Sequence, residues 1–430
     1  MAVLSSAGVL KRSFALTVFF TLLFFYLLFS SGEQLHLVLG IYKPKIGHIL
    51  ALVLFGWVML QKLVWKLERR MLIAFAFILA SLVLSAVFGA APLRSFGYVG
   101  VYLFNFLVYF FLPLQIVMNT DLDRFFRIYW GSFLVVGSYA ALQVALSIVG
   151  VYDPLALQRV IMIARGQAWT YEPSYYALYM IPYVMFHNGA ALLREYKRPM
   201  SRIKLFCQNM LMLISTSTGL IVSYPVFLVS ILFKRLNPFQ KEVRQKFTKM
   251  LTTSFILLAV FTVLFYEIAL HSIFKFFYFG FLAHWSFSAR WEGIVAACKT
   301  FIRHPILGAG LGGVSTEGFR EESVYDLKME TLQEFEAFDP TNCFTEVLAS
   351  LGIVGLLAFI YLGYVFYRSF QEVMKDLSID LESKKIATAL FLSLVVMIVA
   401  LQMNQGLFRP YVWIHAAVVY GYFQRIRTFS

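Results

Sequence analysis

Apolar segments of membrane-spanning length recur throughout this chain, and they restrict its fold more than any other feature. A helix needs about 20 apolar residues to cross a bilayer, and twelve segments approach that length: 13–31, 46–61, 71–91, 97–118, 128–150, 173–193, 205–216, 219–233, 251–270, 343–367, 386–404 and 410–424. The chain is 60% hydrophobic and 14% charged, whereas soluble domains are about 45–50% apolar and about 25% charged. We therefore exclude a cytosolic enzyme, a secreted disulfide scaffold and a disordered chain. We expect an all-α, polytopic integral membrane protein with about 12 transmembrane helices.

The positive charge of the chain predicts its orientation. If both termini share one side, about two thirds of the 37 Lys and Arg residues fall on that side, mostly within Lys62–Arg70, Arg194–Lys204 and Lys234–Lys249. Positive residues favour the cytoplasm, so we expect both termini to be cytoplasmic. The length of the first span favours a retained anchor over a signal peptide. The net charge of +14 then indicates contact with membrane lipids rather than with nucleic acid.

One connection, residues 271–342, is far longer than the others and falls on the outer side. It contains an expected helix, Ser288–Phe301, a turn at His304-Pro305, a glycine run, Gly308–Gly313, and an acidic tail over 317–339. Long connections are usually functional. We therefore expect the chemistry of this protein on its outer face.

The glycine run resembles a nucleotide-binding pattern only in its letters. Gly308-Ala-Gly310-Leu-Gly-Gly313 fits Gly-x-Gly-x-x-Gly, but that fingerprint requires a preceding strand and a βαβ unit. Here the run follows a proline turn on the outer face, so we reject a dinucleotide site and expect no cofactor. The glycines instead predict a tight turn or a close approach of helices. The scattered histidines and the three cysteines have no ligand spacing, so we expect neither a metal site nor a disulfide framework.

Four arginines on the outer side are candidates for binding an anionic substrate. Arg290 lies in the expected helix and Arg303 precedes His304, and a guanidinium binds phosphate in a bidentate manner. Arg159 and Arg165 are six residues apart, so on a helix at most one of them would point inward. The alternative for these arginines is contact with lipid headgroups at the interface. For His304, a structural role is at least as well supported as a catalytic one.

Polar side chains also stand where two spans begin. Glu172 precedes Pro173 at the sixth span, and Asn342 precedes the tenth span, with Glu346 one turn inside it. Glu172 fits equally well a helix cap favoured by the helix dipole and a functional ionisable group at the membrane edge. Tyr171 belongs to a tyrosine cluster that fits either an interfacial aromatic belt or stacking on sugar rings.

Together, these segments resemble the O-antigen polymerase and O-antigen ligase superfamily of bacterial membrane glycosyltransferases. Ser288-Ala-Arg290 followed by Arg303-His304-Pro305-Ile-Leu-Gly308-Ala-Gly310 resembles the family's arginine plus His-Pro-x-x-Gly-x-Gly signature. Thr341-Asn342 leading into Leu351-Gly352-Ile-Val-Gly355 resembles the beginning of its following span. Tyr171-Glu172-Pro173-Ser174 is similar to the Glu-Pro-Ser element of its polysaccharide-polymerase branch. The predicted layout agrees over the whole chain.

The resemblance implies a single glycosyltransferase C-like membrane domain, residues 1–430, with 271–342 as its periplasmic loop, in the bacterial inner membrane. It implies an inverting, metal-independent polymerisation of undecaprenyl-diphosphate-linked repeat units of O-antigen or exopolysaccharide. A chain-length regulator and a flippase are the expected protein partners. We expect Arg290 to stabilise the diphosphate and Glu172 to be the leading candidate for a general base. The expected substrate-binding residues are Arg159, Arg165, Arg303, His304, Tyr171 and Asn342.

Two other functions stay open at this point. Ligases, which transfer glycan to lipid A-core, carry a His immediately before the Asn of the Thr341-Asn342 element, and here that residue is Thr341. This departure favours a polymerase and leaves the identity of any base open. A lipid or glycan transporter often has internal repeats, but the two halves of this chain show no convincing repeat.

Overall fold

The computed structural model describes residues 6–35, 37, 45–60, 67–156, 159–160, 163–193, 202–215, 217–249, 252, 256, 285–314, 342–403 and 406–429. The long loop is therefore described over 285–314 and at Asn342. The expected span 251–270 lies almost entirely outside the described residues, and the acidic tail 317–339 lies wholly outside them.

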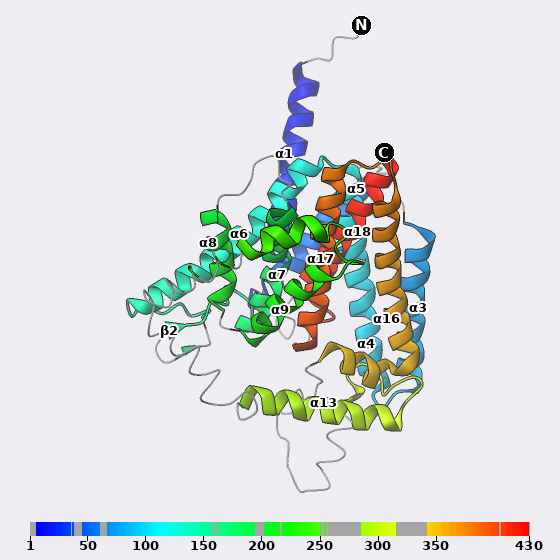
Figure 1. Ribbon diagram of the computed structural model, residues 1–430. Coiled ribbons are helices and arrows are strands. Elements are labelled where there is room, and N and C mark those ends of the chain that lie inside the picture. Colours follow the sequence, from blue (N-terminus) through cyan, green and yellow to red (C-terminus); the bar gives the residue numbers. More distant parts are fainter. Residues whose placement is uncertain are drawn as a thin grey trace.

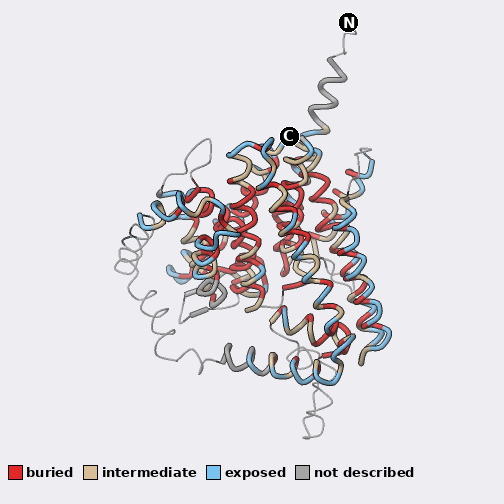
Figure 2. Tube along the Cα trace, turned by 45° about the vertical axis from the view of Figure 1, so that its right-hand side comes forward, coloured by how far each residue is buried: buried red, intermediate tan, exposed pale blue. Residues whose placement is uncertain are grey.

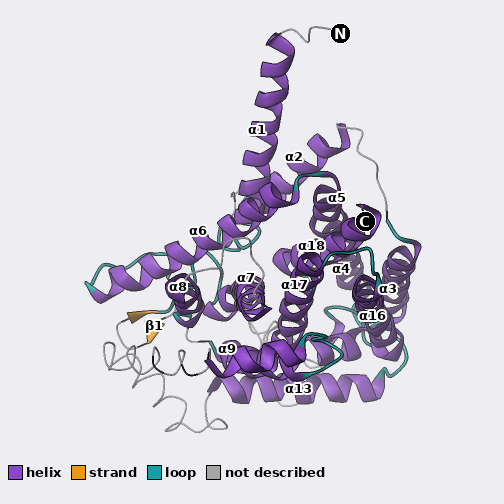
Figure 3. Ribbon diagram, turned by 45° about the horizontal axis from the view of Figure 1, so that its top comes forward, coloured by secondary structure: helices purple, strands orange, loops and turns teal. Residues whose placement is uncertain are grey.

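The regular structure of the described residues is helical except for one hairpin of two two-residue strands, which confirms the all-α class (Figure 1 and Figure 3). In chain order the elements are α1 (Ser6–Phe29), α2 (Ile46–Leu60), α3 (Arg69–Phe88), α4 (Pro92–Phe104), the π-helical η1 (Asn105–Phe111), α5 (Leu112–Asn119), α6 (Leu122–Ile148), β1 (Arg159–Val160), β2 (Ile163–Ala164), α7 (Pro173–Leu193), α8 (Arg202–Leu213), α9 (Thr218–Leu232), α13 (Trp285–Arg303), α16 (Cys343–Lys375), α17 (Leu381–Ala400), the 3-10 turn η3 (Leu401–Met403) and α18 (Pro410–Phe429).

Several helices have the length and composition needed to cross a membrane. Five described stretches qualify: Arg69–Phe88, Pro92–Asn119, Leu122–Ile148, Cys343–Lys375 and Leu381–Met403. Four shorter apolar helices accompany them: Ala15–Phe29, Ile46–Leu60, Ile203–Leu213 and Ser223–Leu232. The chain is therefore a membrane-embedded helical protein, whereas the number of twelve spans stays a prediction.

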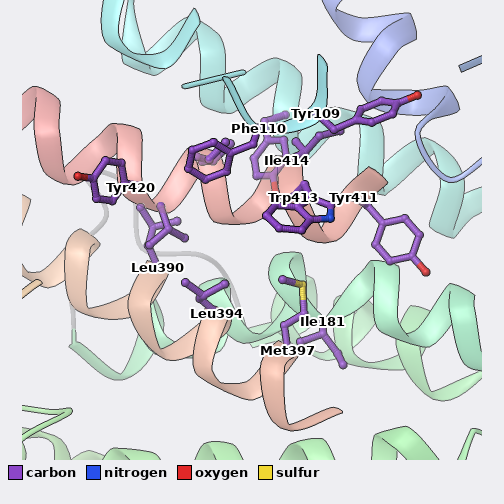
Figure 4. Packing of buried hydrophobic residues seen from close by; sticks show 14 of the residues in the cluster. Tyr109, Phe110, Ile181, Leu390, Leu394, Met397, Tyr411, Trp413, Ile414 and Tyr420 are labelled. Atoms are coloured by element: carbon purple, nitrogen blue, oxygen red, sulfur yellow. The ribbon is translucent and has the colours of Figure 1, made fainter. Parts of the chain in front are cut away.

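The core lies where α7 packs along α17. Nearly every residue of α7 is buried, and Gly189 lets the two helices meet, since a Cβ added there would lie 3.3 Å from the Ala389 Cβ. Aromatic side chains of α18, among them Tyr411 and Trp413, cover this pair from a third side (Figure 4). Buried residues accordingly concentrate in the middle of the bundle, and exposed ones follow its outer helices (Figure 2).

Segments that are distant in the sequence meet at one end of the bundle. The Gln34 backbone N–H donates to the Trp169 carbonyl (3.0 Å), and the Ala90 N–H donates to the Ala309 carbonyl (2.8 Å). We call this end, formed by residues 30–35, 163–172 and 304–314, the loop face. The first turns of α1 and the last turns of α18 lie at the opposite end of the bundle, while α13 crosses the loop face (Figure 1).

Backbone contacts join the glycine run to α16. Gly308 has φ 71° and Gly352 has φ 64°, and Gly352 marks a kink inside α16. The Ala309 N–H donates to the Ala349 carbonyl (2.9 Å) and the Gly310 N–H to the Ser350 carbonyl (2.9 Å). This confirms the predicted tight turn and close approach, and it shows that Gly352 serves a backbone junction.

We expect Gly308→Ala and Gly352→Ala to destabilise the protein by about 2 kcal/mol or more each, because L-residues disfavour the left-handed region. A Cβ at either position would also lie 2.2 Å from backbone atoms of the facing segment. The measurement is the thermal unfolding midpoint in detergent. Gly363→Ala is the matched control, because a Cβ there meets nothing within 4 Å. Equal midpoints for all three variants would contradict the proposed junction.

Candidate functional site

A cavity of about 820 Å³ opens among the helices beside the loop face. Its walls come from α2, α4, residues 311–314, the first turns of α16 and residues 406–410. The charged side chains among its lining residues are Lys45, Arg409 and Glu346. A cavity of this size, lined by both polar and apolar groups, is large enough for a ligand site.

Arg409 enters the cavity from the turn that precedes α18. Its guanidinium forms an ion pair with Glu33, whose side chain is only 2% exposed. The guanidinium carbon also lies 3.7 Å from the centroid of the Tyr175 ring. Burial alone would lower the pKa of Arg409, but the negative charge of Glu33 outweighs burial and raises that pKa above its ordinary value. Arg409 is therefore a permanently charged group held in a fixed orientation.

Glu33 ties three segments together behind this arginine. It follows the last turn of α1, and its second carboxylate oxygen accepts a hydrogen bond from the Tyr171 backbone N–H (3.1 Å). Nearby, the Trp169 indole N–H donates to the Ser31 hydroxyl (2.9 Å). The segment around Tyr171 is thereby fixed against the end of α1 and the beginning of α18.

Lys45 supplies the second cation, at the residue immediately before α2. Its ammonium nitrogen lies 5.8 Å from the centroid of the Tyr171 ring. Burial lowers the pKa of Lys45, and the charge of Glu33 opposes this only in part. A bound anion would favour the charged form of this lysine.

Glu346 lines the same cavity from the first turn of α16. Asn342 begins that helix as its N-cap, since its side-chain oxygen accepts the Thr345 N–H (3.0 Å) and its amide nitrogen donates to the Gln402 carbonyl (2.8 Å). The structure therefore gives Asn342 a structural role in placing Glu346. Its predicted contact with substrate stays a prediction.

Glu172 immediately precedes α7 and is bonded to its first turn. Its carboxylate accepts the Ser174 hydroxyl (2.8 Å), and its carbonyl accepts the Tyr175 N–H (3.1 Å) at the first turn of α7. Glu172 is not among the residues that line the cavity. Tyr171 is 44% exposed, and it links Glu33 to Lys45.

The segment containing Arg159 and Arg165 forms a hairpin rather than a helix. Arg159 pairs with Ala164 across β1 and β2, so an argument from helical spacing does not apply. The Arg165 guanidinium Nε donates to the Ser215 carbonyl (3.1 Å), which joins this segment to the turn before α9. The Arg159 side chain lies outside the described part of the structure.

The remaining predicted residues lie on or beside α13. This helix confirms the one expected over Ser288–Phe301, and it contacts α16. Arg290 lies on its first turns, with its side chain outside the described part of the structure. Arg303 is exposed at the last residue of the helix, and the half-buried His304 begins the turn that leads to Gly308.

Sequence analysis missed Lys45, Arg409 and Glu33. A signal was present, because each stands within a few residues of the end of an apolar segment, where ionisable groups are often functional. They lie in short connections, whereas the functional prediction was built mainly on the long loop. Within the described ranges, no three His, Cys, Asp or Glu side chains are close enough to hold a metal ion.

We expect Arg409→Gln to destabilise the protein by about 3 kcal/mol or more, because it leaves a buried carboxylate without its cation. The double variant Glu33→Gln/Arg409→Gln should regain part of this loss. Unfolding midpoints of both single variants and the double variant complete the thermodynamic cycle. Strictly additive losses would show that the two side chains do not interact.

No curated protein matches the chain. A family model described as O-antigen ligase (Wzy_C) matches residues 205–360. The matched segment includes Arg290, His304, the glycine run and Glu346. The match does not distinguish polymerases from ligases. Over residues 205–360 this chain therefore resembles the O-antigen ligase family, which confirms the resemblance to the O-antigen polymerase and ligase superfamily.

Proposed function

We propose that this protein is a bacterial inner-membrane glycosyltransferase that polymerises undecaprenyl-diphosphate-linked oligosaccharide repeat units of O-antigen or exopolysaccharide. The observation that carries the proposal is the cavity beside the loop face, where Lys45 and Arg409 lie with Glu346. Two of its walls, the glycine run and the start of α16, belong to the segment that matches the O-antigen ligase family.

The reaction transfers a glycan from a lipid diphosphate to a sugar hydroxyl. The acceptor oxygen attacks the anomeric carbon from the side opposite the diphosphate, the carbon–oxygen bond to the diphosphate breaks, and the configuration inverts. Negative charge develops on the departing diphosphate, and cations positioned beforehand stabilise it. Lys45 and Arg409 serve this purpose in the proposal, so the transfer requires no metal ion.

A carboxylate accepts the proton of the acceptor hydroxyl. Glu346 is favoured because it lines the same cavity as the two cations, and a base must lie within hydrogen-bond reach of its proton. Glu172, the candidate from the sequence, is the alternative.

Arg290 and Arg303 are proposed to guide the diphosphate along α13. Guanidinium groups at the membrane surface attract anionic headgroups. His304 and Tyr171, with Arg159 and Arg165, are the proposed contacts to the glycan.

The uneven distribution of Lys and Arg along the sequence supports a periplasmic loop face and cytoplasmic termini. The donor then arrives after a flippase has moved it across the membrane. A chain-length regulator is a further proposed partner.

The polysaccharide of a clean deletion strain, run on a gel beside wild type, tests this function. Single repeat units attached to lipid A or to the carrier lipid, without the ladder of longer products, would support a polymerase. Complete polymer that accumulates on the carrier lipid would establish a ligase instead. Repeat units retained on the cytoplasmic face would establish a transporter.

We expect Lys45→Met to lower the transfer rate by about two to three orders of magnitude, by analogy with the loss of an oxyanion-hole donor. Arg290→Lys should also fail, because lysine lacks the planar fork of arginine. The measurements are the rate of polymer formation by purified protein and the length of the polymer in cells. Lys299→Met is the matched control, because Lys299 is an exposed cation on α13. Polymer of wild-type length from both tested variants would refute these roles.

Glu346→Gln should lower the rate at saturating donor while leaving donor binding within about twofold, since the amide cannot accept the proton. Glu172→Gln keeps an oxygen that accepts the Ser174 hydroxyl, so we expect it to retain most of the activity. Single-turnover transfer rates separate the two carboxylates. The reverse order of losses would assign the base to Glu172.

A further inference from the structure

A π-helical turn interrupts the long helical stretch Pro92–Asn119. This turn is η1, and the backbone N–H of Leu112, the residue after it, donates to the Leu107 carbonyl five residues earlier. π-helical turns are rare, and within α-helices they occur frequently at functional sites. Asn105, the first residue of η1, lines the cavity and is only 3% exposed. The π-helical turn therefore begins at the wall of the candidate site.

This turn lets one helix contact α18 and the residues before it at two places. The Asn105 side-chain amide donates to the Phe408 carbonyl (3.0 Å), and the Phe110 ring lies edge-on to the Trp413 ring, with 6.4 Å between centroids. Side chains five positions apart on an α-helix point about 140° apart, so a regular helix could direct only one of the two toward α18. The hydrogen bonds of a π-helix join residues five apart, which brings both side chains to the same face.

The carbonyl that Asn105 holds belongs to the peptide bond between Phe408 and Arg409. This peptide lies in the turn before α18, where the Arg409 backbone N–H donates to the Gly406 carbonyl (3.0 Å). Because a peptide group is planar, fixing its carbonyl also fixes the direction in which the Arg409 side chain leaves the backbone. Glu33 holds the guanidinium at the other end of that side chain. Arg409 is thus held at both ends, and Asn105 holds the backbone end.

A second side-chain hydrogen bond to η1 provides a structural comparison. The Tyr26 hydroxyl of α1 donates to the Val108 carbonyl (2.8 Å), and Tyr26 is fully buried. Neither Tyr26 nor Val108 is among the residues that line the cavity. Both bonds satisfy a buried carbonyl, as buried polar groups require, but the bond from Asn105 also acts on the segment that carries Arg409.

We propose that Asn105 is a positioning residue, whose amide holds the Phe408 carbonyl so that the Arg409 guanidinium stays directed at an anion in the cavity. The π-helical turn brings this amide to the carbonyl. The identity of the anion as the donor's diphosphate rests on the proposed function. The positioning itself can be measured with inorganic pyrophosphate, which carries the same charged groups without glycan or lipid.

The binding test titrates inorganic pyrophosphate into the full-length protein in nanodiscs by calorimetry. We expect Asn105→Leu, which keeps the side-chain volume but removes the donor, to raise the Kd about tenfold, by analogy with the cost of a small displacement in an active site. Tyr26→Phe is the matched control and should stay within about twofold of wild type. Each variant loses one buried hydrogen bond, so both should lower the unfolding midpoint.

A double-variant cycle separates positioning from a general loss of structure. Arg409→Lys keeps a cation beside Glu33 but removes the planar fork that Asn105 would orient. We therefore expect Asn105→Leu to change the Kd of the Arg409→Lys protein by less than about twofold, although it changes that of wild type about tenfold.

The kinetic test measures kcat/KM for transfer from the lipid-linked donor. We expect Asn105→Leu to lower it by about 10- to 100-fold and Tyr26→Phe to leave it within about twofold. No binding of pyrophosphate by wild type, equal effects of Asn105→Leu with and without Arg409, or equal effects of the two single variants would overturn the proposal. If the cycle shows coupling but wild type forms no polymer, the positioning role stands and the proposed function fails.

Discussion

The site depends on one buried ion pair between the end of α1 and the beginning of α18. Glu33, 2% exposed, holds the guanidinium of Arg409 and also accepts the Tyr171 N–H. A buried carboxylate is costly unless it is paired and hydrogen-bonded. Its pairing therefore fixes the separation of three segments that are far apart in the sequence. The same contact keeps one permanent cation among the residues that line the cavity.

A second constraint places the Glu346 carboxylate in the same cavity as that cation. The glycine run and the kink of α16 meet backbone to backbone, because Gly308 and Gly352 adopt φ angles that side chains disfavour. The Asn342 cap then starts α16 with Glu346 on its first turn. Residues 311–314 and Glu346 consequently form neighbouring walls of one cavity. The segment that resembles a known family thus forms the junction that shapes the cavity, in addition to contributing Glu346 to its lining.

The apolar segments predicted the helical membrane fold, and the glycine run predicted the tight turn at Gly308; the helix at Ser288–Phe301 was also expected. The hairpin at Arg159 was missed because two paired residues on each strand leave no periodic signal. The cations of the cavity were missed for a different reason. Lys45 and Arg409 lie 364 positions apart, and only tertiary packing brings them into one cavity. The sequence shows that the long loop is charged. It does not show that charged residues of separate short connections lie together in the fold.

The most direct test of this account is a structure of the protein bound to undecaprenyl diphosphate in a lipid nanodisc. The account predicts that the diphosphate lies in the cavity, within hydrogen-bond distance of both Lys45 and Arg409. A diphosphate bound on α13 at Arg290 and Arg303, with the cavity filled by other groups, would contradict it.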